Sequence, residues 1–151
     1  PPDALYAALQ LRSLVFVVEQ RCVFLDLDGA DADATHLFGW TTDGDGRPLL
    51  GAYARLYVPG IKYAEASIGR VVSHPAVRRT GAGRALVREA LARLADAPDA
   101  LAPGAPVRIG AQLYLERFYG SFGFVRDGAV YDEDGIDHVE MLRGGGVGRG
   151  R

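Results

Sequence analysis

Two arginines and two glycines stand where a helix is expected to begin, in the run Arg78-Arg79-Thr80-Gly81-Ala82-Gly83. The first backbone N–H groups of a helix have no partner inside the helix, and the helix dipole favours an anion there. Glycines let the backbone approach a ligand closely, and arginine adds forked hydrogen bonds to phosphate oxygens. The run predicts a pyrophosphate site, although arginine and glycine are also common in exposed turns.

Two familiar nucleotide motifs do not fit this run. A Walker A loop requires Gly-Lys-[Ser/Thr], and no lysine follows Gly83. A dinucleotide fingerprint requires a third glycine, but that position is Leu86. The phosphate site, if present, belongs to another class of protein.

The elements around the run alternate between strands and helices. A strand is expected over 66–74, followed by a helix over 81–97 with one apolar side, formed by Ala85, Leu86, Ala90, Leu91 and Leu94. Further helices are expected from about Ala4 to Val15 and over 113–122, and a short buried strand over 107–112. Turns are expected at Asp43-Gly44-Asp45-Gly46 and Asp134-Gly135, each between two strands. This order predicts an α/β (α+β) fold, a mixed central sheet with helices on both faces.

Composition narrows the class of protein. The chain has 151 residues, a net charge of −2 and a single cysteine, Cys22. We expect one domain over 1–143, a disordered Gly/Arg tail over 144–151, and no nucleic-acid or membrane partner. A single cysteine predicts a reducing, cytoplasmic setting. The histidines at 36, 74 and 138 lack metal-ligand spacing, and no metal is expected.

Two motifs in order carry a family resemblance. The first is Arg78-x-x-Gly81-x-Gly83, between a strand and an amphipathic helix, and the second is Tyr119-x-x-x-Gly123-Phe124. Together they resemble the GNAT acetyltransferases. Runs such as "IGRVVSH", "GAQLYLERFYGSFGFV" and "VYDEDGIDHVEM" are similar to the ElaA-like branch. The chain departs from that branch at Tyr114, where histidine is usual, and at Val23 and Asp137, where proline is usual.

The resemblance implies a sheet of six to seven strands with a splay between its two central parallel strands. It also implies acetyl-CoA as cosubstrate and an amine, either a small molecule or a peptide, as acceptor. The cofactor-binding residues would be Val71, Val72, Ser73, Arg78, Arg79, Thr80, Gly81, Ala82, Gly83, Arg84, Gln112 and Phe118. The strand around Val71, Val72 and Ser73 would pair with the pantetheine arm, and one of its N–H groups would polarise the thioester carbonyl.

Direct transfer needs an acid for the leaving thiolate and a base for the attacking ammonium. By resemblance, Tyr119 is the expected acid. The base stays open between Glu65 and the histidines His36 and His138, of which His138 alternates with Glu140 on one strand. Cys22 has no visible base and is expected to be structural.

The sequence is also compatible with other interpretations of the acidic run, the function and the oligomeric state. The acidic run from Asp26 to Asp33 either attracts a cationic amine or forms a solvated loop. The alternative functions are a CoA-binding regulatory protein without turnover and an interaction domain without a CoA site. Monomer and homodimer are both open.

Overall fold

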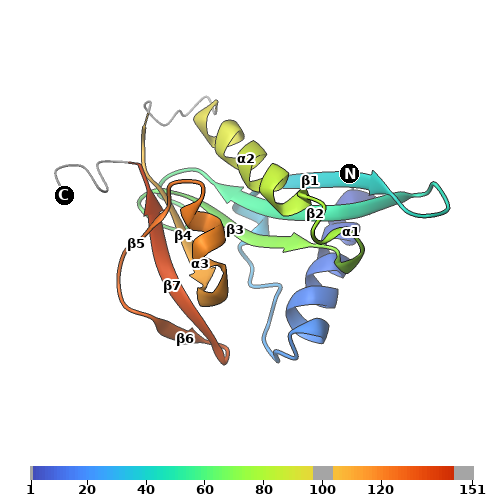
Figure 1. Ribbon diagram of the computed structural model, residues 1–151, viewed down its shortest axis with the longest axis horizontal. Coiled ribbons are helices and arrows are strands. Elements are labelled where there is room, and N and C mark those ends of the chain that lie inside the picture. Colours follow the sequence, from blue (N-terminus) through green and yellow to red (C-terminus); the bar gives the residue numbers. More distant parts are fainter. Residues whose placement is uncertain (1, 97–103, 145–151) are drawn as a thin grey trace. The chain divides into compact units, whose positions relative to one another are not determined.

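The strands of the computed structural model, which describes residues 2–96 and 104–144, form one mixed sheet (Figure 1). It has seven strands in the order β1-β2-β3-β4-β7-β5, with β6 paired to β7. The strands are β1 (Thr35–Thr42), β2 (Pro48–Tyr57), β3 (Ala66–Ser73), β4 (Val107–Gln112), β5 (Val125–Arg126), β6 (Tyr131–Glu133) and β7 (Ile136–Arg143). The mixed sheet predicted from the sequence is confirmed.

Two compact units share this chain. The first comprises Pro1–Leu56 and Arg70–Ala90, and the second Tyr57–Gly69 and Leu91–Arg151. Strand β3 begins in the second unit and ends in the first. The expectation of one domain over 1–143 stays a prediction, and most of the expected tail, 145–151, lies outside the described residues.

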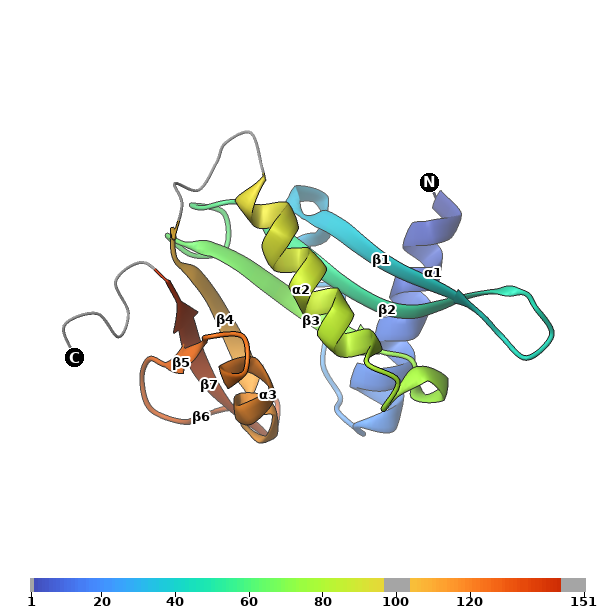
Figure 2. The ribbon, with the colours of Figure 1, turned by 45° about the horizontal axis from the view of Figure 1, so that its top comes forward.

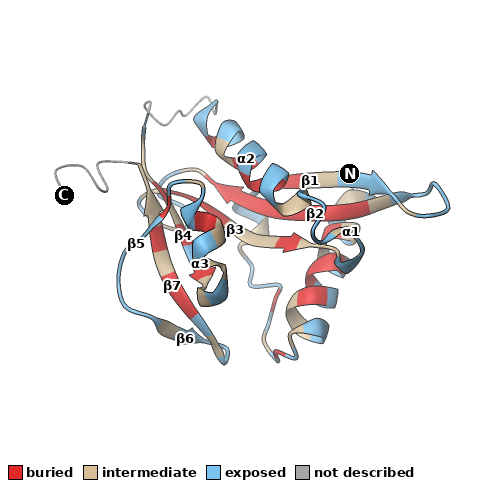
Figure 3. Cartoon of the chain, viewed as in Figure 1, coloured by how far each residue is buried: buried red, intermediate tan, exposed pale blue. Residues whose placement is uncertain are grey.

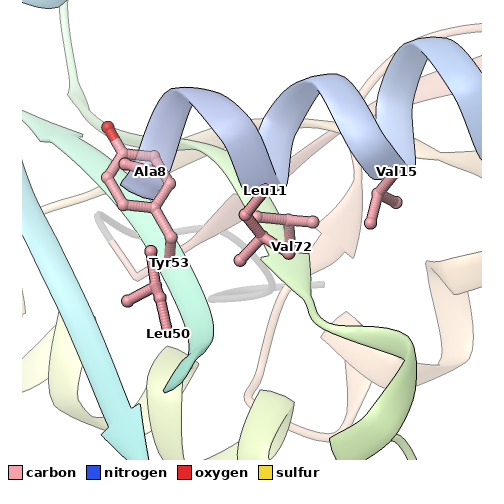
Figure 4. Packing of buried hydrophobic residues seen from close by; sticks show 6 residues of the cluster. All are labelled: Ala8, Leu11, Val15, Leu50, Tyr53 and Val72. Carbon is pink, nitrogen blue, oxygen red and sulfur yellow. The ribbon is translucent and has the colours of Figure 1, made fainter. Parts of the chain in front are cut away.

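The core of the first unit forms under its N-terminal helix. Helix α1 (Pro2–Arg12) continues into a π-helical segment (Ser13–Glu19), so the expected helix end at Val15 was four residues short. Buried residues on one side of these helices pack against strands β2 and β3 (Figure 4). The cluster contains Ala8, Leu11, Val15, Leu50, Tyr53 and Val72.

A bulge in β2 explains how Leu50 and Tyr53 reach the same cluster. Gly39 pairs with Ala52, but the next residue, Trp40, pairs with Leu50. The extra residue, Gly51, breaks the strict alternation of side chains. The β1–β2 hairpin otherwise turns where Asp43-Gly44-Asp45-Gly46 predicts.

Helix α2 (Ala82–Ala95) lies on the side of β1 and β2 opposite α1 (Figure 2). Buried and exposed stretches alternate along α2 (Figure 3). Its buried residues are Leu86, Val87, Ala90 and Leu94. Ala85 was expected on the apolar side but is exposed, and Val87 was missed. Leu86, Ala90 and Leu94 define the apolar side of the helix. Ala85 and Val87 flank Leu86, and the helical period alone does not decide which of the two faces the core.

Strand β3 contains a non-glycine residue in a left-handed conformation. Arg70 has a φ of 49° in the middle of the strand. Such a conformation costs an L-residue about 1–2 kcal/mol, so its side-chain contacts must stabilise it.

The second unit is built on three antiparallel pairings to β7. Strands β4, β5 and β6 all pair with it, and β4 also pairs in parallel with β3 at Ala66–Val107 and Ser67–Arg108. The splay expected further along these two strands stays a prediction. The turn between β6 and β7 has positive φ at Asp134 (54°) and Gly135 (83°), as a two-residue hairpin requires.

The short helix of the second unit, α3 (Glu116–Gly120), follows a 3-10 turn (Leu113–Leu115). A helix was expected over 113–122, ending at Gly123. Across the described ranges, no helix combines the length and apolar character needed to cross a membrane.

Candidate active site

The loop between β3 and α2 has the geometry expected of an anion-binding turn. Arg79 (φ 66°) and Gly81 (φ 88°) are both left-handed, which reverses the chain just before the helix. The amide of Ala85 donates to the carbonyl of Gly81 (3.0 Å) as the first bond of the helix. A Cβ added at Gly81 would meet no atom within 4 Å, so the turn is open on that side.

Local hydrogen bonds hold this loop in place. His74 accepts a bond at Nδ1 from the amide of Ala76 (3.0 Å), and its own amide donates to the carbonyl of Gly51 (2.7 Å). The Thr80 hydroxyl donates to the carbonyl of Val77 (2.5 Å). His74 is therefore a capping residue for the turn Pro75–Val77, and Thr80 fixes the backbone before the glycine.

Arg78 is engaged by a residue at the end of the π-helical segment. Its guanidinium donates to both carboxylate oxygens of Glu19, at 2.8 and 2.5 Å, and to the carbonyl of Ser73 at 3.4 Å. Both side chains are about two-fifths exposed, and the bond from Arg78 lowers the pKa of Glu19. A phosphate at this turn would compete with Glu19 for Arg78.

The remaining predicted cofactor residues of the first unit surround the same loop. Val72 is buried in the core, whereas its neighbours Val71 and Ser73 are half-buried. Of the helix start, Arg79, Thr80 and Arg84 are exposed, and Ala82 and Gly83 are half-buried. Strand β3 leads directly into this loop, and the binding of CoA by these residues stays a prediction.

Tyr119 lies on α3 in the second unit and is enclosed by aromatic rings. Phe118 and Phe124 contact it edge-on, with ring centroids 5.2 and 6.1 Å away. Burial, with a smaller contribution from Tyr114, raises the pKa of Tyr119 above its usual range. The hydroxyl therefore stays protonated at neutral pH but is a weaker acid than an exposed phenol. Its role as the acid stays a prediction.

Glu65 is paired with an arginine. Arg108 donates to both of its carboxylate oxygens (3.0 and 3.1 Å) and also binds Glu140 and Asp127, each at 2.8 Å. The hydrogen bond from Arg108 lowers the pKa of Glu65. A carboxylate so stabilised is a poorer proton acceptor than an ordinary glutamate.

His138 lies at one end of the β4–β7 ladder. Its Nδ1 donates to the carbonyl of Ile136 (2.7 Å), which leaves Nε2 directed at Glu133 (3.4 Å). Gln112 lies opposite it on β4, and Tyr131 stacks on its ring. The carbonyl bond selects the tautomer with a lone pair at Nε2, as a base requires.

His36 and Cys22 have structural positions. The Nε2 of His36 donates to the carbonyl of Asp31 (3.0 Å), and its Nδ1 accepts from the Tyr53 hydroxyl (2.6 Å). Both ring nitrogens are thus engaged. Cys22 is buried. Within 2–96 and 104–144, no three His, Cys, Asp or Glu side chains are grouped as a metal ion would need.

Sequence reasoning missed an arginine–aspartate network in the first unit. It consists of Arg12, Arg55, Arg70, Asp26, Asp28 and Asp31. Arg12 is 0% exposed and binds Asp26 (3.0 Å) and Asp31 (2.7 Å). The signal available in the sequence was Arg12, an arginine on the inward side of the expected N-terminal helix.

The network changes the interpretation of the acidic run. Arg55 binds both oxygens of Asp28 (2.9 and 2.7 Å), and Arg70 binds Asp26 (2.8 Å). The bond from Arg55 is the main cause that lowers the pKa of Asp28. Three arginines neutralise three of the four aspartates, so neither a solvated acidic loop nor a strong attractant for cations describes this segment.

Comparison with known proteins extends these observations to nearly the whole chain. A family model described as "Acetyltransferase (GNAT) domain" matches residues 48–143. Protein ElaA of Escherichia coli is 42% identical over 141 residues, covering 92% of this chain and 86% of its own.

Solved structures agree with the sequence comparison. An acyl-CoA N-acyltransferase from Pseudomonas aeruginosa superposes with a TM-score of 0.81 at 41% identity, covering 95% of this chain and 92% of that one. The crystal structure of Escherichia coli ElaA gives 0.78 at 41% identity, covering 92% and 88%. The chain belongs to the GNAT acetyltransferase superfamily, in its ElaA-like branch, and is an acyltransferase.

Proposed function

We propose that this protein transfers the acetyl group of acetyl-CoA to the nitrogen of an amine by direct attack. The observation that carries the proposal is the left-handed turn at Arg79 and Gly81. This turn precedes the first residues of α2, and a Cβ added at Gly81 would meet no atom within 4 Å, so a ligand has room there. First-turn amides of a helix suit a pyrophosphate, and the two arginines add charge. The family supplies acyl-CoA as the general donor.

In this proposal CoA lies along the first unit. The pyrophosphate binds between Arg78 and Arg84, and the pantetheine arm follows Val71, Val72 and Ser73 as an added strand would. Arg78 leaves Glu19 for the phosphate, since a doubly charged pyrophosphate is a stronger partner than one exposed carboxylate. Gln112 and Phe118 are kept as proposed CoA-binding residues on the family resemblance alone.

The chemical step exchanges one bond for another. The amine nitrogen attacks the thioester carbonyl carbon, a C–N bond forms, and the C–S bond breaks. The thiolate takes a proton from Tyr119, and the attacking nitrogen loses one to a base. We favour His138 over Glu65, because Nε2 of His138 carries the lone pair whereas both oxygens of Glu65 accept bonds from Arg108.

The test is thiol release from acetyl-CoA with a panel of amines, polyamines, amino acids and peptide N-termini. Acceptor-dependent release that falls roughly a hundredfold or more in Tyr119→Phe supports the enzyme and its acid. Unchanged release in Tyr119→Phe removes that residue from the step. No release from any acceptor, with CoA still raising the melting temperature, supports a regulatory protein instead.

A paired variant tests the cofactor site separately. In Arg78→Ala with Arg79→Ala, the rise in melting temperature that CoA produces should shrink. An identical rise in the double variant and the unmodified protein would place CoA elsewhere. We also propose the cytoplasm as the setting, where acetyl-CoA is available and the thiol of Cys22 stays reduced.

A further inference from the structure

Two tyrosine hydroxyls of the second unit converge over one glycine of β4. A Cβ added at Gly110 would lie 3.1 Å from the hydroxyl oxygen of Tyr131 and 3.6 Å from that of Tyr63. Tyr131 reaches this point from β6, with its ring stacked on His138 at 5.8 Å. The hydroxyls therefore share the face of the sheet that carries His138.

Glycine at position 110 leaves this space open. Glycine weakens a strand interior and often marks a place where another group approaches the backbone. Any side chain at 110 would press on the Tyr131 hydroxyl. Neither phenol hydroxyl donates or accepts a hydrogen bond within the part of the chain that the structure describes, so both can serve a ligand.

The surroundings of the two hydroxyls are negative. Glu140 lies directly opposite Gly110 in the β4–β7 ladder. Arg108 binds Glu140 through Oε1, together with Glu65 and Asp127. Three carboxylates thus share one guanidinium, and a fourth, Glu133, lies 3.4 Å from Nε2 of His138.

The effect of this charge is visible at the phenols. Burial is the main cause that raises the pKa of Tyr131 to about 12, and Glu133 and Glu140 add to it. Burial and the same two carboxylates raise the pKa of Tyr63. A cation placed between these groups would gain from each of them.

We propose that Tyr63, Tyr131 and Glu140 bind the charged ammonium of a diamine acceptor, at the end away from the nitrogen that is acetylated. An ammonium has three N–H donors, which two phenol oxygens and one carboxylate can accept. Aromatic rings add cation–π attraction. This inference rests on the proposed function, because it names the acceptor of that reaction.

The charge explains why the bound nitrogen is the one that does not react. A negative site stabilises the protonated amine, which has no lone pair for attack on a thioester. The group held beside Glu140 therefore remains an ammonium, and the other end of the acceptor is free to lose its proton.

Two acceptors that differ only at that end provide the test. They are 1,3-diaminopropane and 3-aminopropan-1-ol, in which a hydroxyl replaces one ammonium. We expect kcat/KM with acetyl-CoA to favour the diamine by about tenfold or more, as for hydrogen bonds to a charged group. Tyr63→Phe combined with Tyr131→Phe should reduce this preference by about tenfold, whereas Tyr6→Phe, at an exposed tyrosine of α1, should not change it.

A binding measurement separates this inference from the proposed function. Calorimetry of 1,3-diaminopropane with CoA and no acetyl donor reports binding without turnover. Binding that is lost in the double variant, with no transfer to any amine, supports the ammonium site and refutes the function. Transfer at equal efficiency to both acceptors, or an unchanged preference in the double variant, overturns the inference and keeps the function. If the double variant melts early, Glu140→Gln, which retains an acceptor for Arg108, replaces it.

Discussion

Replacing Arg12 with methionine should destabilise the first unit strongly, although methionine keeps an unbranched apolar stem at this position. Arg12 is 0% exposed, and its partner Asp26 is 4% exposed. Removing one member of a buried ion pair costs about 3–5 kcal/mol, because the remaining charge is left in a poorly solvated site. Here Asp26 keeps Arg70, so we expect the lower end, about 3 kcal/mol.

The assay is urea or thermal unfolding at neutral pH. For a chain of this size about 3 kcal/mol corresponds to a fall in melting temperature of roughly 6–12 °C. The matched control is Arg126→Met, because Arg126 binds both oxygens of Glu116 (2.7 Å each) at the surface. A control shift as large as that of Arg12→Met would refute the importance of burial.

The same comparison has a defined pH dependence. Burial disfavours the charged form of Asp31, but hydrogen bonds from Arg12 and Arg55 outweigh this effect and lower the pKa of that carboxyl. A lowered folded-state pKa stabilises the protein above the unfolded value, near ~3.9, and this stabilisation is lost as pH falls. The difference between Arg12→Met and the unmodified protein should be constant from pH 5 to 8 and shrink below about pH 4. A loss already complete at pH 6 would contradict this account.

Three further outcomes follow from the candidate site. Glu19→Gln should strengthen CoA binding severalfold in calorimetry, because Arg78 no longer has a charged competitor; weaker binding would mean that Glu19 positions Arg78 for the phosphate. Gly81→Ala should cost about 1–2 kcal/mol in urea unfolding, since φ is 88° there, and unchanged stability would show that the turn relaxes. With His138 as base, His138→Gln should lower acceptor-dependent thiol release roughly a hundredfold or more, whereas Glu65→Gln should lower it less; the reverse order would favour Glu65.

Local patterns predicted the parts of the structure that depend on local chemistry. The turn at Asp134-Gly135 and the helix start after Gly81 were both predicted, because each needs a residue that tolerates positive φ. Both are properties that a few neighbouring residues determine. The family resemblance added the sheet of six to seven strands with two central parallel strands.

The features that were missed depend on residues far apart in the sequence. Arg12 and Asp31 are nineteen positions apart, and Arg70 and Asp26 forty-four, so no periodic pattern joins them. The hydroxyls over Gly110 come from residues on either side of it in sequence, and only the three-dimensional register brings them together. Ion pairs and convergent hydroxyls of this kind require the fold before they can be recognised.

The left-handed conformation of Arg70 has a consequence for how the sequence can change during evolution. Glycine would relax the backbone at φ 49° but would remove the bonds to Asp26 and Asp28. Lysine would keep the charge but lose the forked geometry. Both replacements therefore weaken the bonds to the aspartates, and a change at this position requires a compensating change among those aspartates first.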